Sequence, residues 1–190
     1  MRPIEPGDKD ALARGFERLS EESRYQRFMT GIQELSQGEL VYLTEVDHHD
    51  HEALIAFNAK DLDEGVGVAR FVRAPGSDAA EAAVTVIDDW QGRGLGTALC
   101  NLLAERAREE GVKRFTALML AGNTQMLDVL ASLGPAEVLS REAGTVEISV
   151  DLPEEGIGEH LAGVLRVAAG GTIELATPPW GLRALKDGEP

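Results

Sequence analysis

Hydrophobic residues near the start of the chain recur at three- and four-residue spacing, which is the period of an amphipathic helix. Leu12 and Phe16 show this spacing within residues 10–20. The same pattern continues in residues 20–31 and residues 36–46. The sequence therefore predicts that helices precede any strand.

The apolar pattern then shortens to runs that are typical of strands, bounded by turn residues. Three such runs cover residues 51–58, 65–74 and 80–87, with polar and Gly/Pro turns between them. Short connections of this kind predict strands that follow one another as antiparallel neighbours.

Helical and strand patterns alternate in the second half of the chain. They predict a helix, a strand, a second helix with Asn123 as its N-cap, and two last strands, at residues 95–111, 114–120, 124–133, 136–140 and 145–152. The order favours a mixed α/β (α+β) fold, with a sheet flanked by helices rather than a regular βαβ array.

The texture of the sequence changes at Pro153. We assign residues 1–152 to one folded domain and residues 153–190 to a small C-terminal helix-and-strand extension. Apolar residues in residues 156–171 form one helical face. We expect this extension to pack on the core or to contribute to an oligomer contact, such as that of a homodimer.

Charge and composition narrow the class of partner. The 190 residues are 43% hydrophobic, which suits one core rather than two full domains. The formal net charge of −15 repels nucleic-acid phosphates and favours positively charged amines. No apolar run approaches the roughly 20 residues of a membrane span, and the first residues lack a signal-peptide pattern. We therefore expect a cytoplasmic protein that binds neither nucleic acid nor membrane, with its single cysteine, Cys100, as a core thiol.

The segment DDWQGRGLGT, residues 88–97, places three glycines at alternate positions between a strand and a helix. Glycine loses more backbone entropy on folding than other residues, so its repeated use indicates a need for bare backbone. The first N–H groups of a helix have no internal acceptor, and the helix dipole favours an anion there. The segment therefore predicts a site for a phosphate or pyrophosphate.

Two common phosphate motifs do not fit this segment. The dinucleotide fingerprint G-x-G-x-x-G requires a glycine where Thr97 stands, and the chain has no Gly-Lys-Ser/Thr triplet for a Walker A loop. The remaining pattern is Q-x-x-G-x-G, formed by Gln91, Gly94 and Gly96.

In its strand–turn–helix context, this pattern resembles the acetyl-CoA pyrophosphate site of the GNAT superfamily of N-acetyltransferases, over residues 1 to about 150. FERLSEESRYQRF (16–28) and AEAAVTVIDDWQGRGLG (80–96) are further similar to the catalytic domain of bacterial Pat-type protein-lysine acetyltransferases. The first of these segments also has a simpler interpretation as an amphipathic packing helix. The resemblance implies a GNAT fold with a mostly antiparallel twisted sheet, acetyl-CoA as co-substrate, no metal, and a basic amine acceptor, foremost a protein lysine.

The resemblance also implies a set of cofactor contacts. The end of the strand at residues 80–87 binds the pantetheine arm through its main chain, and the glycine turn binds the pyrophosphate. The implied cofactor-binding residues are Val84, Thr85, Val86, Ile87, Gln91, Gly92, Arg93, Gly94, Leu95, Gly96, Thr97 and Asn123. Simpler roles are a solvated loop arginine for Arg93 and a plain N-cap for Asn123.

The same resemblance makes Glu81 the general base, because it occupies the family's base position on the strand before Gln91. A main-chain N–H near Thr85 or Val86 would hold the thioester carbonyl, and four strand residues span roughly 13 Å. Glu81 would therefore act through bound water, unless it is a solvated carboxylate without a catalytic role. Leu130 stands where the family often has a tyrosine that protonates the leaving thiolate.

Residues 47–51, DHHDH, place three histidines in a polar segment before a strand. Histidine is a common Zn²⁺ ligand, but adjacent ligands on one short turn rarely converge on an ion without a further partner. We expect a solvated turn or a substrate-entry loop here.

Three functions are compatible with the sequence. The first is an acetyl-CoA-dependent protein-lysine acetyltransferase, and the second is an acetyltransferase for a small amine. The third is a catalytically silent acyl-CoA-binding regulatory module, which the leucine at position 130 favours and which Glu81 and the glycine turn argue against.

Overall fold

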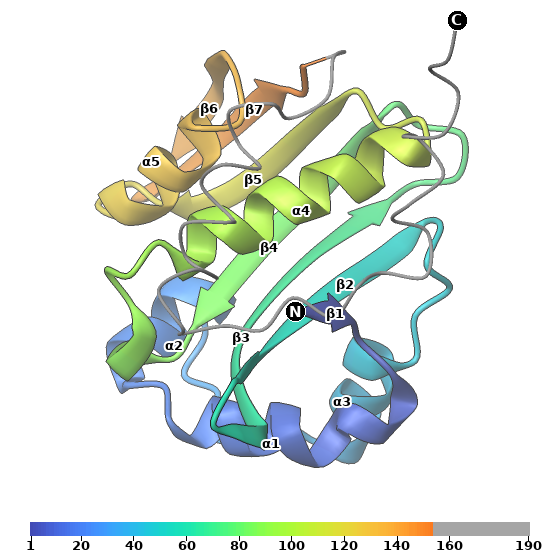
Figure 1. Cartoon of the computed structure of the whole chain (residues 1–190). Helices are drawn as coiled ribbons and strands as arrows, with labels where there is room; N and C mark the ends of the chain where they lie inside the picture. The colour runs from blue at the N-terminus through green and yellow to red at the C-terminus, as the bar shows by residue number, and fades with distance from the viewer. Residues whose placement is uncertain (154–190) are drawn as a thin grey trace, which may run out of the picture.

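The computed structural model describes residues 1–153, and Figure 1 shows how their elements are arranged. The strands are β1 (Arg2–Pro3), β2 (His51–Asn58), β3 (Asp61–Arg73), β4 (Ala79–Val86), β5 (Arg114–Leu120), β6 (Ala136–Glu142) and β7 (Thr145–Asp151). The helices are η1 (Pro6–Asp8), α1 (Lys9–Glu17), α2 (Glu21–Phe28), α3 (Gln37–Thr44), η2 (Asp88–Trp90), α4 (Leu95–Glu109) and α5 (Thr124–Ala131). The predicted extension, apart from Pro153, lies outside the described residues.

Two strands are longer than the sequence predicted, because tight turns join them directly to their neighbours. β3 begins at Asp61, opposite Asn58 across a two-residue turn, although its first three residues are exposed. β6 runs to Glu142 because Ala143 and Gly144 form the next turn, with φ of 47° and 86°. Positive φ at both central residues is the type I′ geometry that suits the twist of a hairpin.

All seven strands form one sheet in the order β1-β2-β3-β4-β5-β7-β6. Every neighbouring pair is antiparallel except β4 and β5, which run parallel. The prediction of a mixed, mostly antiparallel sheet flanked by helices is therefore confirmed.

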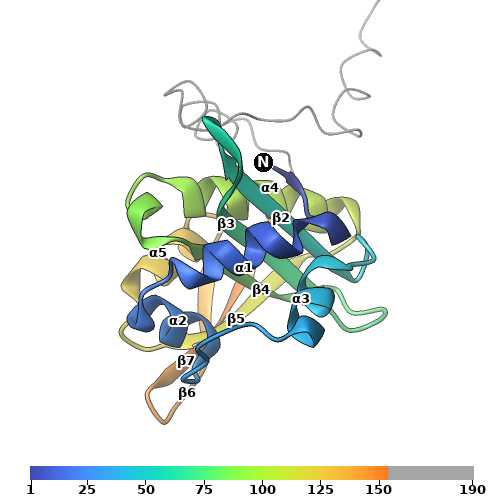
Figure 2. The same ribbon diagram turned by 90° about the horizontal axis from the view of Figure 1, so that it is seen from below.

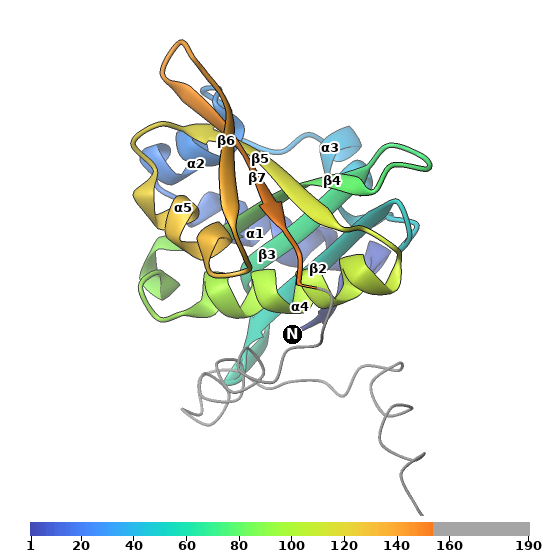
Figure 3. The ribbon, with the colours of Figure 1, turned by 90° about the horizontal axis from the view of Figure 1, so that it is seen from above.

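Helices cover the two faces of the sheet in separate groups. Figure 2 shows α1, α2 and α3 on one face, and the opposite view in Figure 3 shows α4 crossing the other face. On the α4 face, Leu99 and Leu103 are fully buried against the sheet, where Phe71 and Phe115 are also buried. Cys100 belongs to the same core at 2% exposure, so the prediction of a core thiol is confirmed.

The parallel pairing of β4 and β5 is short, and this creates the main opening in the fold. The two strands pair over three positions, the last of which joins Glu81 to Thr116. Beyond that pair, β4 and β5 separate on the way to their C-terminal ends (Figure 1). We call the gap between them the fork.

No helix in the described part of the chain is both long enough and apolar enough to cross a membrane.

Candidate active site

The fork opens into a cavity of about 600 Å³, which is within the usual range for small-molecule sites. Its walls come from the end of β4, the turn before α4, the starts of α4 and α5, and helix α2 on the opposite side. All the predicted cofactor-binding residues line this cavity except Ile87 and Arg93. Ile87 is 3% exposed and belongs to the core, whereas the guanidinium of Arg93 lies 5.2 Å from the ring centre of Trp90.

The main chain of β4 directs alternate N–H groups into the fork. The N–H of Ile87 donates to the carbonyl of Val66 on β3, and Thr85 pairs with Val68 of the same strand. Because hydrogen-bonding direction alternates along an antiparallel strand, the N–H groups of Val84 and Val86 point the other way, toward β5. Those two N–H groups, rather than that of Thr85, are placed to bind a ligand in the fork.

The glycine turn, residues 91–97, has the backbone geometry of an anion site. Gly94 is the N-cap of α4 with φ of 79°, and Gly92 has φ of 69°, a region that residues with a side chain rarely adopt. No side chain caps the helix, and its first turn contains no acidic residue. The N–H groups of that turn therefore remain available to an anion, and the helix dipole favours one.

Gly96 has a different role from the two glycines before it. A Cβ atom built on Gly96 lies 3.8 Å from the side chains of both Val86 and Val129, which face each other across the cavity. A larger side chain at this position would fill the gap between β4 and α5. Gly96 therefore keeps the cavity open, rather than freeing the backbone.

The side chain of Gln91 binds protein groups in this structure. Its Nε2 donates to the carbonyl of Val86 at 3.0 Å and to Oγ of Ser23 on α2 at 3.2 Å. Ser23 also donates to Asp88, which accepts further hydrogen bonds from Ser20 at the start of α2. Gln91 thus fixes the glycine turn to the end of β4 and to helix α2, and its own contact with a cofactor stays a prediction.

Asn123 is the N-cap of α5, as predicted, because its Oδ1 accepts a hydrogen bond from the N–H of Met126 at 3.0 Å. Its side-chain amide group keeps two donors on the cavity wall. Leu130, in contrast, is 1% exposed in the core, and its side chain offers no proton to a leaving thiolate. Neither Tyr25 nor Tyr42 lines the cavity.

Glu81 lies at the closed end of the fork, at the last position where β4 pairs with β5. Its side chain is exposed and lines the cavity. In the strand register it faces Val72 on β3, which in turn faces His51 on β2. Residues directly opposite one another share a face of the sheet, so Glu81 points to the side that carries α1, α2 and α3.

Helix α2 contributes more to the cavity than the sequence pattern indicated. Ser23, Gln26 and Arg27 line the wall opposite the glycine turn. The sequence of α2 also suited a simple packing helix. In the structure, however, α2 has no buried residue. Its low apolar content was the signal that this helix lines a site, although Phe28 at its end also packs against the core.

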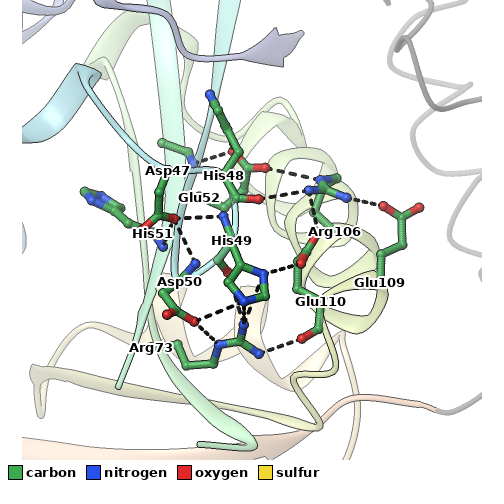
Figure 4. Close-up of polar contacts among 11 residues, drawn as sticks. Asp47, His48, His49, Asp50, His51, Glu52, Arg73, Arg106, Glu109 and Glu110 are labelled. Carbon is green, nitrogen blue, oxygen red and sulfur yellow. Dashed lines mark hydrogen bonds and ion pairs between the residues drawn. The ribbon is translucent and has the colours of Figure 1, made fainter. Parts of the chain in front are cut away.

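The histidine segment, residues 47–51, forms a turn that protein contacts fix in place (Figure 4), while Asp47 and His49 remain exposed. Oδ1 of Asp47 accepts hydrogen bonds from the three N–H groups that follow at positions 49–51. His48 contacts Glu52 at 2.7 Å, and His49 contacts Glu110 at the end of α4 at 2.5 Å. The expectation of a solvated turn therefore holds for Asp47 and His49, although protein contacts also fix the turn, and a role as a substrate-entry loop stays a prediction.

The centre of this cluster is a buried ion pair. The carboxylate of Glu52 is 1% exposed and accepts from Nε of Arg106 at 3.2 Å (Figure 4). Arg73, which is also buried, binds Asp50 at 2.7 Å. These contacts join the start of β2 to the last turn of α4. The described residues contain no group of His, Cys, Asp and Glu that is arranged to hold a metal ion.

Comparison with known proteins identifies the family. The model of the acetyltransferase (GNAT) family matches residues 15–134, so the chain belongs to the GNAT acetyltransferases. The resemblance inferred from the glycine turn is confirmed, and so is the classification as an N-acetyltransferase.

Individual relatives agree with this assignment. "Acetyltransferase Pat" of Mycolicibacterium smegmatis is 36% identical over 154 residues, which cover 80% of this chain and 45% of that protein. "Acetyltransferase PA5475" of Pseudomonas aeruginosa is 31% identical over 70% of this chain and 73% of its own length. This chain thus spans less than half of the length of the Pat relative.

Solved structures show the same fold. The GNAT domain of S. lividans PAT aligns with a TM-score of 0.72 and 32% identity, over 80% of this chain and 89% of that domain. YncA of Salmonella typhimurium, described as a putative acetyltransferase with its cofactor acetyl-CoA, aligns with a TM-score of 0.62 and 18% identity, over 83% and 96% of the two chains. The second similarity concerns the fold alone.

Proposed function

We propose that the protein is an acetyl-CoA-dependent N-acetyltransferase that modifies lysine side chains of proteins, with Glu81 as a water-mediated general base. The observation that carries this proposal is the fork, which has an anion-binding turn at its open end and a carboxylate at its closed end. An extended ligand with a phosphate group at one end and a reactive group at the other would suit this arrangement.

The residues present fit acetyl-CoA. The first turn of α4 would bind the pyrophosphate through main-chain N–H groups, and the N–H groups of Val84 and Val86 would bind the extended arm and the carbonyl oxygen of the acetyl group. When bound, the cofactor supplies an activated acetyl thioester. A main-chain donor fixed in place for the carbonyl oxygen stabilises negative charge that develops there during attack by an amine.

The attacking amine must lose its proton before it can react. A lysine with a pKa near 10.4 is neutral in only about one molecule in 2,500 at pH 7, which corresponds to roughly 4.6 kcal/mol. Glu81 is the carboxylate at the fork, and it faces the side of the sheet from which an acceptor approaches past α2. We infer that Glu81 accepts the proton through ordered water, while the leaving thiolate takes its proton from water.

A protein lysine is the acceptor that the relatives and the charge favour. The proteins named Pat share more than 30% identity with this chain, and the net charge of −15 attracts a cationic acceptor over a distance. We further infer a cytoplasmic protein that requires no metal. A homodimer remains a prediction that depends on the C-terminal extension.

The test is to incubate the purified protein with radiolabelled acetyl-CoA and two separate acceptor panels. One panel contains lysine-rich proteins and peptides, and the other contains polyamines, aminoglycosides and amino acids. We expect label to appear on lysine side chains, as located by mass spectrometry of the products. Label on the small amines alone would replace the protein acceptor with a small one, and cofactor binding without any transfer would establish a silent module.

A further inference from the structure

Arg27 and Arg70 lie on the face of the sheet that carries α1, α2 and α3, and neither is paired with a carboxylate. Arg27 on α2 makes no hydrogen bond or ion pair with any described residue, and its guanidinium lies 5.0 Å from the ring centre of Phe28. Arg70 on β3 is 6% exposed and donates to the carbonyl of Leu43 at 3.0 Å and contacts His51 at 3.1 Å. Neither contact supplies a negative charge to Arg70.

Both arginines line a small cavity that adjoins the fork. This cavity has a volume of about 60 Å³ and lies between β3, β4 and the helices α1, α2 and α3. Arg27, Ala83 and Thr85 line both this cavity and the larger one that holds Glu81. The small cavity is therefore next to the place where the acceptor amine would meet Glu81.

The two arginines give this cavity a positive charge that favours the binding of an anion. A buried cation without a counter-charge is costly, because it has lost the solvation of water. Burial, together with the nearby positive charge of Arg27, lowers the pKa of Arg70 to about 10. Burial likewise lowers the pKa of Arg27, an effect that the charges of Glu81 and Tyr42 oppose in part. Both side chains remain cationic at neutral pH.

The composition of the chain makes this lack of a partner informative. The sequence contains 33 acidic residues against 18 lysines and arginines. Two other buried or half-buried arginines pair with a carboxylate, Arg73 with Asp50 and Arg106 with Glu52. Glu81 is within electrostatic reach of Arg27 but makes no ion pair with it. Arg27 and Arg70 therefore lack a paired carboxylate, although the chain is rich in acidic residues.

We propose that Arg27 and Arg70 form a subsite for a carboxylate of the acceptor, so that the preferred acceptor is an amine that carries a carboxylate. The volume leaves room for such a group, since a cavity of about 10–15 Å³ by this measure already holds one water molecule. Leu12, Phe16 and Val68 also line the cavity and suit the methylene groups next to a carboxylate. A guanidinium binds a carboxylate through two parallel hydrogen bonds.

The inference rests on the proposed acetyl transfer, and it narrows the acceptor. The carboxylate has two sources: the side chain of an acidic residue beside the acceptor lysine of a protein, or the carboxylate of a free amino acid. The structure requires only that amine and carboxylate belong to one molecule and lie at Glu81 and Arg27 respectively. Acceptor pairs that differ only in that charge distinguish the sources.

The experiment compares each acceptor acid with its amide. Lysine peptides with Glu or Gln on either side form one series, and amino acids of increasing chain length with their carboxamides form the other. Arg27→Gln is the test variant, because the side chain makes no hydrogen bond whose loss would disturb the fold. Arg14→Gln is the matched control, since Arg14 is exposed on α1 and bonds only to a carbonyl of the β2–β3 hairpin.

We expect the wild type to prefer the acid member of a pair by about 10- to 100-fold in KM, the range for a hydrogen bond to a charged group. Arg27→Gln should remove this preference by raising KM for the acid member to that of its amide, and Arg14→Gln should keep the preference. Calorimetric titration of the CoA-loaded protein with each acid and amide measures the same preference without turnover. A result in which no acceptor is acetylated but the acid still binds better would contradict only the proposed function.

Equal use and equal binding of acid and amide by the wild type would overturn the inference. It would also be overturned if Arg27→Gln kept the preference, or if the variant lost only the ability to use succinyl-CoA in place of acetyl-CoA. In that last case the arginine pair would bind a carboxylate of the acyl group. The proposed acetyl transfer would survive each of these results.

Discussion

Replacing Glu81 with Gln is the most direct test of an active enzyme with a general base. The register places Val84 three residues from Glu81 and Val86 five residues away, which corresponds to about 10 Å and about 17 Å along β4. Neither distance allows direct contact between the carboxylate and an amine at the acetyl group. A path through one or two water molecules suits the shorter distance, so Val84 is the N–H that fits a base at Glu81.

We expect Glu81→Gln to lower kcat/KM by about 10² to 10⁴ near neutral pH, the usual range for a lost general base. The neutral fraction of a lysine rises about 100-fold between pH 7 and pH 9, because its pKa lies near 10.4. The deficit of the variant should shrink by a similar factor over that interval. Acetyl-CoA affinity should stay unchanged, since the substitution is at the closed end of the fork.

The assay is a pH–rate profile with one confirmed acceptor, for wild type, Glu81→Gln and the control Glu137→Gln, an exposed glutamate on β6. Cofactor binding is measured in parallel by calorimetry. Profiles of wild type and Glu81→Gln that run parallel, offset by less than about threefold between pH 6 and 9, would exclude Glu81 as a base. Catalysis would then depend on substrate positioning and the main-chain donors alone.

Three further predictions concern other parts of the molecule. Gly94→Asp should abolish acetyl-CoA binding in calorimetry while circular dichroism shows an intact fold, because a carboxylate would occupy the anion position; retained affinity would refute the assignment of the turn. Burial raises the pKa of Cys100 to about 12, so the thiol should resist iodoacetamide at pH 8 until the protein unfolds, and rapid alkylation of the native protein would contradict its core position. The hydrogen bond from His49, with Arg106 beside it, holds the pKa of Glu110 below its ordinary value of 4.5, so this carboxylate stabilises the fold above that pH and the contribution is lost as the pH falls through the lowered value. Urea unfolding should therefore show wild type losing more stability than Glu110→Gln between about pH 6 and pH 3, and equal losses would refute this role.

Local sequence patterns were enough to locate most of the elements and the phosphate turn. Hydrophobic spacing predicted α1 to α5 and β2 to β7 because most of them bury one face, and glycine at positions 92, 94 and 96 indicated the turn. It missed the 3-10 helices η1 and η2, and the expectation that helices precede any strand was wrong, because the two-residue strand β1 comes first and is too short to show a period. The strand ends were less certain where polar residues continue a hairpin, as at Asp61. Such residues pair through main-chain hydrogen bonds, and the pattern of apolar and polar side chains does not indicate this pairing.

The remaining parts of the site depend on which strands become neighbours. The pattern of β4 alone does not reveal that its pairing with β5 stops at Glu81, or that Val84 and Val86 face the gap. The same holds for Arg27 and Arg70, which lie 43 positions apart in the sequence and meet only through tertiary packing. Contacts between residues so far apart in the sequence produce no local periodicity, so the sequence pattern does not predict them.

The fork also gives the sheet a third edge, in its middle. Open strand edges are where protein chains add to one another and aggregate, and most folds shorten, charge or cover them. Here β4 has no ladder partner on its β5 side beyond Glu81, and the side-chain amide of Gln91 donates a hydrogen bond to the carbonyl of Val86. An extended cofactor in this gap would complete the sheet as an added strand does. The concentration of acetyl-CoA would then affect both turnover and the solubility of the folded protein, since the protein with bound cofactor exposes fewer unpaired strand edges than the protein without it.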